Sequence, residues 1–131
     1  MVKKTPSPAK LRELVMQALY QKEMTGSSNT DLIKQFKQNN KNLNLKNFET
    51  YLKEIKKNLL DIDSIIEKHT NRNIEQISKI ELAILKQAIY EIKNSNLDKP
   101  IIISEAIRLA KRFGQDSSHK FVNALLDKAV N

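Results

Sequence analysis

The chain has 131 residues, the length of one domain with a sizeable core, and it contains no cysteine and only two histidines, far apart in sequence. Disulfides and thiolate metal sites are therefore excluded, and we expect no metal site and no cofactor. The 23 Lys and Arg residues outnumber the 15 Asp and Glu residues and give a formal net charge of +8, which favours nucleic acid or an acidic protein surface as a partner. A bias in genome base composition also produces lysine-rich chains, so the charge alone leaves both interpretations open.

Helices are predicted almost throughout, because the chain has two glycines, three prolines and no long alternation of apolar and polar residues. We therefore expect an all-α fold of about six to seven helices in a single domain over residues 1–131. The first helix is predicted to begin at Ser7, a suitable N-cap, with Pro8 in its first turn. It should end at Gly26, because a helix terminus in the left-handed conformation favours glycine.

Two further helices are predicted on either side of a polar loop. A short helix follows Thr30 and Asp31, and its apolar side consists of Leu32, Ile33 and Phe36. The stretch "KQNNKNLNLKN" is a loop by composition. After it, apolar residues at three- and four-residue spacings predict one long helix from Phe48 to His69.

The C-terminal part of the chain predicts three helices. The first runs through "IEQISKIELAILKQAIYEIKN", and "SNLDKP" ends it because the residue before Pro100 is disfavoured in helical geometry. The other two meet at Gly114, which we expect in the left-handed conformation, with Asp116 or Ser117 as the cap of the last helix. The core stripe of that last helix is predicted to be Val122, Leu125, Leu126 and Ala129.

No pattern indicates catalysis, and we expect the protein not to be an enzyme. Glycine-rich phosphate loops are absent, and Ser117, Ser118 and His119 are adjacent in sequence rather than arranged as a nucleophile and its base. We interpret His119 as a solvated side chain and His69 as a structural one. No apolar run is long enough to cross a membrane and no secretion signal is present, so we expect a cytoplasmic protein without membrane contact.

The first helix carries two apolar lines. One is the expected core stripe, and Met16, Tyr20 and Met24 form a second line almost opposite to it. This second line is either buried because the helix lies centrally among others, or it is a contact surface for a partner. Methionines beside a tyrosine suit an adaptable contact surface. The core stripe consists of Leu11, Leu14, Val15, Ala18 and Leu19.

The N-terminal segment is basic. Lys3, Lys4, Lys10 and Arg12 occur there without any acidic residue, and we expect residues 1–7 to form a flexible basic arm. Positive charge near a helix N-terminus does not favour folding, so this arrangement indicates contact with phosphates instead.

The chain contains the segments "ISEAIRLAKRFGQDSSHKFVNALLDKA", "RELVMQALYQKE" and "IELAILKQAIYEI". These segments resemble the NusB family of bacterial transcription antitermination factors. The resemblance covers essentially the full length. It implies an all-helical domain of two small helical bundles. It also implies that the protein binds the boxA element of nascent RNA together with NusE, a small-subunit ribosomal protein, and so helps RNA polymerase through ribosomal RNA operons.

The resemblance also implies which residues would bind. The RNA surface would comprise the basic arm with Lys3, Lys4, Lys10 and Arg12, and the start of the last helix with Ser117, Lys120 and Phe121. The NusE surface would comprise Tyr20, Met24 and Glu81. The chain departs from the family at "SPAK", where an arginine-rich run is common, and at Ser117, where an acid is common.

Alternatives remain open for the function of the protein and for the role of Phe121. A helical protein-interaction module that homodimerises through Met16, Tyr20 and Met24, without specific RNA binding, would explain the second apolar line. An RNA cytosine methyltransferase with a similar domain would need a cofactor-binding domain, for which we expect no room. Phe121 lies at the edge of the core stripe of the last helix, so it is either a packing residue or a platform for an RNA base.

Overall fold

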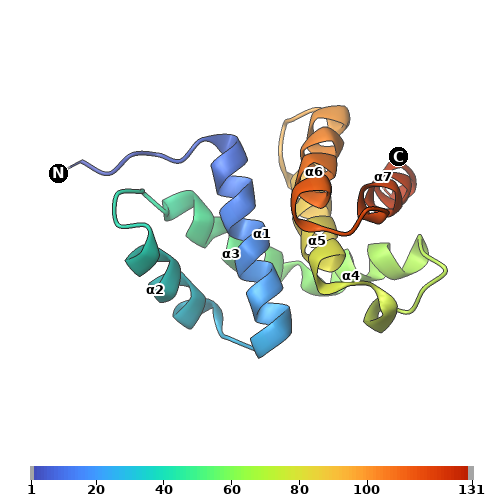
Figure 1. Ribbon diagram of the computed structural model, residues 1–131, viewed down its shortest axis with the longest axis horizontal. Coiled ribbons are helices and arrows are strands. Elements are labelled where there is room, and N and C mark those ends of the chain that lie inside the picture. Colours follow the sequence, from blue (N-terminus) through green and yellow to red (C-terminus); the bar gives the residue numbers. More distant parts are fainter. Residues whose placement is uncertain (1, 130–131) are drawn as a thin grey trace. The chain divides into compact units, whose positions relative to one another are not determined.

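The computed structural model describes residues 2–129, and within this range the chain forms seven α-helices, one short 3₁₀ helix and no strand (Figure 1). The chain divides after Lys57 into two compact units. The all-α fold predicted from the sequence is therefore confirmed. No helix in the described range is both long enough and apolar enough to span a membrane.

The first unit begins with α1 (Pro8–Thr25), whose ends form as the sequence predicts. The hydroxyl of Ser7 accepts a hydrogen bond from the Lys10 amide at 3.1 Å, and Pro8 occupies the first turn, where its missing N–H costs nothing. Gly26 ends the helix with a φ of 72°, and its N–H donates to the Lys22 carbonyl at 2.8 Å. These three residues fix the length of α1.

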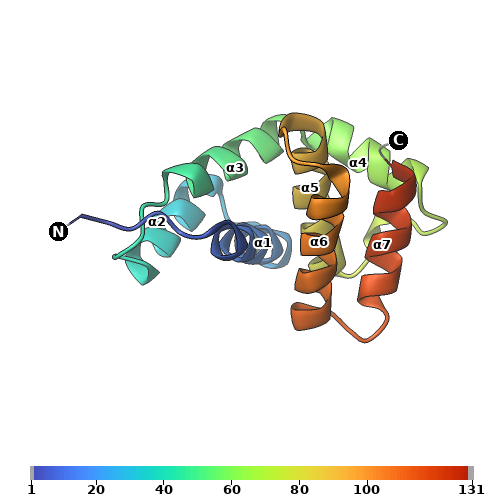
Figure 2. The same cartoon turned by 90° about the horizontal axis from the view of Figure 1, so that it is seen from above.

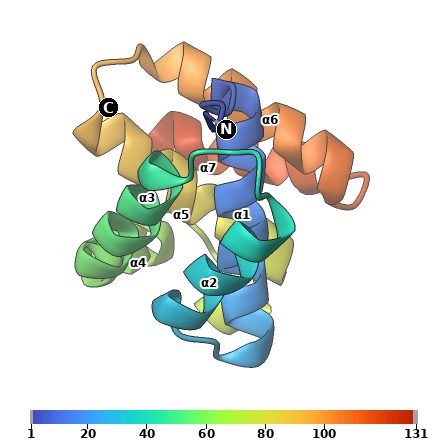
Figure 3. The same ribbon diagram turned by 90° about the vertical axis from the view of Figure 1, so that its left-hand side faces the viewer.

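Helices α2 (Asn29–Asn39) and α3 (Lys46–Lys57) complete the first unit, and α3 packs on both α1 and α2 (Figure 3). α2 begins slightly earlier than predicted, because the Ser28 hydroxyl caps it by accepting from the Asp31 amide. The rings of Phe36 and Phe48 stack in the core with 5.0 Å between their centroids. Phe48 is fully buried, and its burial joins α2 to α3.

The basic segment before α1 is extended and contacts the loop between α2 and α3. The Lys4 amide donates to the Asn42 carbonyl at 2.9 Å, and the Lys4 carbonyl accepts from the Asn44 amide at 2.8 Å. These two hydrogen bonds hold the backbone of Lys4 in place while its side chain is exposed. The flexibility of residues 1–7 stays a prediction.

The long helix predicted from Phe48 to His69 is wrong, because the chain forms two helices there, α3 and α4 (Leu59–Lys68). Asn58 separates them with φ −101° and ψ 12°, outside regular helical geometry. The apolar spacing continues across the break because each helix buries one face, α3 in the first unit and α4 in the second. Periodicity therefore could not reveal the boundary between units.

The second unit contains α4, the 3₁₀ helix η1 (Ile74–Gln76), α5 (Lys79–Asn94), α6 (Lys99–Phe113) and α7 (Ser118–Ala129). Helices α5, α6 and α7 lie side by side, and α4 packs on α5 and α7 (Figure 2). α5 is buried over most of its surface from Glu81 to Ile89. Val122, Leu125 and Leu126 of α7 are buried as predicted, whereas Ala129 is half-buried.

The single helix predicted over "IEQISKIELAILKQAIYEIKN" is also corrected. A capping box starts α5 at Lys79: the Ser78 hydroxyl accepts from the Glu81 amide at 3.1 Å, and the Glu81 carboxylate accepts from the Ser78 amide at 3.4 Å. The sequence "SKIE" carries this signal, so it could have been found without the structure. The separate η1 precedes it.

The prediction that Gly114 is left-handed is wrong, because its φ is −90° and its ψ is −173°, which any residue adopts. Glycine is required there for a different reason. A Cβ at this position would lie 2.7 Å from the Ala110 carbonyl oxygen, 2.7 Å from Ser118 Cβ and 2.8 Å from Ser118 Oγ. Gly114 therefore allows α7 to begin immediately beside the end of α6.

Candidate nucleic-acid and partner surfaces

The start of α7 presents polar and aromatic groups from the predicted RNA surface. Ser117 directly precedes the helix, and its carbonyl accepts from the Phe121 amide at 3.3 Å. Ser117 and Lys120 are exposed, whereas Ser118 is buried and its hydroxyl accepts from the Gln115 amide at 3.0 Å. Ser118 therefore shapes the turn, and its neighbours Ser117 and Lys120 face solvent.

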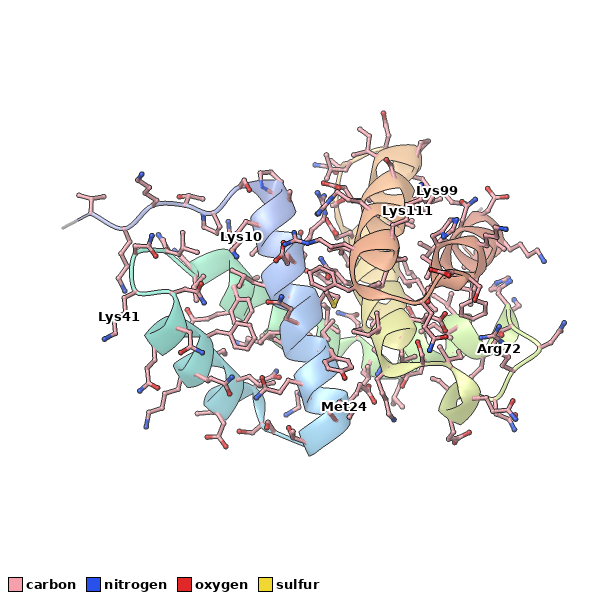
Figure 4. The ribbon with its side chains drawn as sticks, viewed as in Figure 1. Lys10, Met24, Lys41, Arg72, Lys99 and Lys111 are labelled. Carbon is pink, nitrogen blue, oxygen red and sulfur yellow. The ribbon has the colours of Figure 1, made fainter. Side chains whose placement is uncertain are left out.

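Phe121 is half-buried, and a cation covers its ring. The guanidinium carbon of Arg72 lies 4.2 Å from the centroid of the Phe121 ring, a cation–π contact between α7 and the loop that follows α4. Figure 4 shows Arg72 on that loop. The Arg72 amide is itself held by the Thr70 hydroxyl at 3.1 Å. Phe121 is thus neither a fully buried core residue nor a bare aromatic platform.

Arg72 and Phe121 both line a pocket of about 220 Å³, and all of its lining residues lie in the second unit. Side chains of different character line it: a phenylalanine and aliphatic residues supply apolar surface, and an arginine and a lysine supply positive charge. The lining residues are His69, Thr70, Asn71, Arg72, Phe121, Ala124, Leu125 and Lys128. A pocket that combines an aromatic ring with cations suits an anion carrying a flat ring.

Glu81, predicted as a partner residue, is only 6% exposed. Its Oε1 atom lies 3.7 Å from a terminal nitrogen of Arg72, an ion pair too long for a hydrogen bond. The same oxygen accepts from the Ser78 amide. In this geometry Glu81 caps α5 and attracts Arg72, and its contact with a partner stays a prediction.

The basic N-terminal segment divides into exposed and buried side chains. Lys3, Lys4 and Lys10 are exposed, and Figure 4 shows Lys10 at the start of α1. Arg12 is only 6% exposed, so it does not present its guanidinium to solvent as an RNA contact requires. The proposed RNA surface therefore omits Arg12. Periodicity could not separate Arg12 from Lys10, because burial at this position depends on tertiary packing.

The second apolar line of α1 also divides. Met16 is 1% exposed and belongs to the core, which supports the burial interpretation for this residue. Tyr20 is half-buried, and Met24, in the last turn of α1, is 57% exposed (Figure 4). The exposed end of the line is therefore where a partner could bind, at Met24 and the accessible part of Tyr20.

Arg72 is the residue that sequence reasoning missed. It occurs in the polar stretch "HTNRN", which has no periodicity or motif that points to binding. Its relation to Phe121 arises because the loop after α4 folds back beside α7. Only tertiary structure brings these two residues together.

The described residues define an all-α protein of two helical units, and the second unit has a pocket lined by an aromatic ring and two cationic side chains. A family model described as the NusB family matches residues 9–131. The chain therefore belongs to the NusB family.

Individual relatives agree with this assignment. The chain is 36% identical over 124 residues to the transcription antitermination protein NusB of Tolumonas auensis, covering 92% of this chain and 90% of that protein. It is 36% identical over 129 residues to the protein of the same name from Colwellia psychrerythraea, with coverage of 95% and 94%.

Solved structures show the same fold. The NusB structure from T. maritima has a TM-score of 0.88 at 26% identity and covers 96% of this chain and 92% of its own. A crystal structure of the antitermination factors NusB and NusE in complex with double-stranded RNA has a TM-score of 0.78 at 24% identity, covering 93% of this chain and 94% of that chain, and shows the likeness of fold. The prediction of an all-helical, NusB-like fold is confirmed.

Proposed function

We propose that this protein is a transcription antitermination factor that binds boxA-type single-stranded RNA together with the ribosomal protein NusE and acts with RNA polymerase in ribosomal RNA transcription. Membership of the NusB family supports this function, because the matched relatives are named transcription antitermination proteins. The observation that carries RNA binding is the pocket in which Phe121, Arg72 and Lys128 meet. Cations beside an aromatic ring suit the phosphates and unstacked bases of single-stranded RNA.

Exposed lysines of the N-terminal segment are proposed to contact RNA phosphates without reading sequence. Replacing Lys4 and Lys10 together by alanine should weaken boxA and scrambled RNA alike. The slope of log affinity against log salt should become shallower by about 1.4 units, which corresponds to two contacts at about 0.7 each. Fluorescence anisotropy of labelled RNA over a range of salt concentrations measures both quantities.

A matched control tests whether net charge alone is responsible. Lys53 and Lys56 are exposed on α3 of the same unit, and replacing both by alanine removes the same charge. The control should leave the slope within about 0.3 units of the unchanged protein. An equal loss of slope in both double variants would show that Lys4 and Lys10 make no particular contact with RNA.

NusE is proposed to bind at the exposed end of α1, at Tyr20 and Met24. Met24→Lys should weaken NusE binding at least about 10-fold, because a charge replaces an apolar contact. A lysine near the C-terminus of a helix also interacts favourably with its dipole, so α1 should stay folded. Calorimetric titration with purified NusE measures the binding, and circular dichroism checks the fold.

Leu60→Lys is the control for this substitution, because Leu60 is 90% exposed and lies on α4. It changes an exposed apolar residue in the same way at a different place. Equal binding of NusE by unchanged protein and both variants would contradict the proposed site.

The exposure of Met24 also supports a second candidate function, a helical module that homodimerises through this surface. Sedimentation equilibrium, which measures the oligomeric state, distinguishes this interaction module from the antitermination factor. A dimer that Met24→Lys converts to a monomer, combined with no RNA binding by either protein, would favour the interaction module over the antitermination factor.

A further inference from the structure

Phe121 has an aromatic ring next to exposed Lys120, yet a nucleobase could not stack on the ring face that Arg72 covers. The guanidinium carbon lies 4.2 Å from the ring centroid, within the distance of a direct cation–π contact. The Arg72 side chain nevertheless remains 47% exposed. The accessible group at this position is therefore the Arg72 side chain, whose guanidinium contacts the phenyl ring.

We propose that Arg72 is the residue on which an RNA base stacks, with Phe121 supporting the guanidinium from behind. This inference rests on the proposed RNA-binding function and assigns one nucleotide of a single-stranded RNA to the pocket beside α7. A guanidinium is planar and stacks on aromatic faces, so it can be held between a phenyl ring on one side and a base on the other. Lysine could not substitute, because an ammonium has no flat face.

Several contacts hold Arg72 ready for this role. The guanidinium carbon of Arg72 lies 4.2 Å from the centre of the Phe121 ring, and the Glu81 carboxylate attracts one terminal nitrogen from 3.7 Å. The backbone of the loop is fixed as well, since the Arg72 amide donates to the Thr70 hydroxyl and the Asn73 amide donates to the Gln76 side chain. Less entropy is lost when a ligand binds to a group that is already ordered.

Because Glu81 is buried, its ion pair with Arg72 can hold the arginine in place. Glu81 is held by the capping box of α5, so its carboxylate cannot move away from the pocket without loosening the start of that helix. It therefore serves as a fixed anchor for a half-exposed arginine. We infer a positioning role for Glu81, acting through Arg72.

Size and charge indicate what the pocket accepts. Its volume of about 220 Å³ is below the roughly 300–1,000 Å³ of pockets for drug-sized ligands, which fits a single base rather than a longer segment. Lys128 lines the pocket two helical turns after Phe121, and exposed Lys120 precedes Phe121. These lysines can contact the phosphates that flank a stacked nucleotide.

The test compares two charge-conserving substitutions, Arg72→Lys and Arg112→Lys. Arg112 is a matched control because its guanidinium also lies over a phenyl ring, that of Phe113, at 5.0 Å, and it does not line the pocket. Arg72→Lys should weaken binding of boxA RNA about 5- to 150-fold, the range expected for one stacked base, while Arg112→Lys should change it less than about 2-fold. The salt slope should be unchanged in both, because both retain their charge.

A second arm uses the RNA itself. Each base of the boxA oligonucleotide is removed in turn to leave an abasic position, and unchanged protein and Arg72→Lys are titrated with every RNA. At one position the abasic RNA should bind the two proteins equally, because the base that stacks on Arg72 is absent. The fluorescence of 2-aminopurine at that position should change on binding to the unchanged protein, because the base leaves its RNA neighbours, and should change less on binding to Arg72→Lys.

The outcomes distinguish this inference from the proposed function. Failure of the unchanged protein to bind RNA, with or without NusE, would refute the proposed function and this inference with it. Normal RNA binding by unchanged protein and by Arg72→Lys would refute the stacking role and leave the function standing. A loss of affinity in Arg72→Lys that is the same for every abasic RNA, or that comes with a lower urea midpoint of unfolding, would identify Arg72 as a structural residue only.

Discussion

The two glycines of the chain, Gly26 and Gly114, are required for different physical reasons, and substitutions should separate them. Gly26 has a φ of 72°, and a Cβ added to it would meet nothing within 4 Å, so only its backbone conformation demands glycine. Alanine in that conformation costs about 1–2 kcal/mol, offset by about 0.4–1 kcal/mol from the reduced entropy of the unfolded chain. Gly26→Ala should therefore lower the free energy of unfolding by about 1 kcal/mol.

Gly114 has an ordinary backbone conformation, and the cost of replacing it by a larger residue is steric. A methyl group would lie 2.7 Å from the Ala110 carbonyl oxygen, which already accepts the Gly114 amide at 2.9 Å, so that oxygen cannot retreat without loosening the end of α6. The same methyl group would also meet Ser118, whose hydroxyl accepts a hydrogen bond from the Gln115 amide. Overpacking of this kind costs about 1–3 kcal/mol, and Gly114→Ala should destabilise the protein by that amount.

Asparagine distinguishes the two mechanisms, because it tolerates the left-handed conformation but carries a Cβ. Gly26→Asn should be more stable than Gly26→Ala, whereas Gly114→Asn should be no better than Gly114→Ala. Urea unfolding followed by circular dichroism, with linear extrapolation to water, gives the free energy of unfolding of all four variants.

Because Gly114 shapes the turn before Lys120 and Phe121, variants at Gly114 should also lose RNA affinity, and variants at Gly26 should not. A Gly114→Ala protein as stable as the unchanged one, or a rescue by asparagine at 114, would refute the steric argument.

Two further substitutions test the fold of each unit. Phe48→Ala should lower the free energy of unfolding by about 3–5 kcal/mol, since Phe48 is fully buried and stacks on Phe36, and a loss below about 1 kcal/mol in urea unfolding would contradict this packing. Ser78→Ala should cost about 0.5–2 kcal/mol by removing the cap of α5, whereas Ser104→Ala, at an exposed position within α6, should be neutral. Equal thermal midpoints for these two serine variants would show that the capping box does not stabilise α5.

Local sequence determined the helical character of the protein and both ends of α1. Ser7, Pro8 and Gly26 set the limits of α1 through hydrogen bonds and backbone preferences that span a few residues, so they could be predicted. The buried face of α7 followed from the helical period alone. The three segments that resemble the NusB family also identified the family from the order of their residues, without any contact between distant parts of the chain.

Tertiary structure decided what depends on residues distant in sequence. The break at Asn58 was hidden because apolar spacing continues while the helices on either side join different cores. Arg12 and Lys10 are alike in charge, but packing buries the first and leaves the second exposed. Arg72 meets Phe121, far along the chain, because a loop folds back on α7. Sequence period reports which face of a helix is apolar, whereas a steric contact or a stacked pair exists only once two segments share the same space.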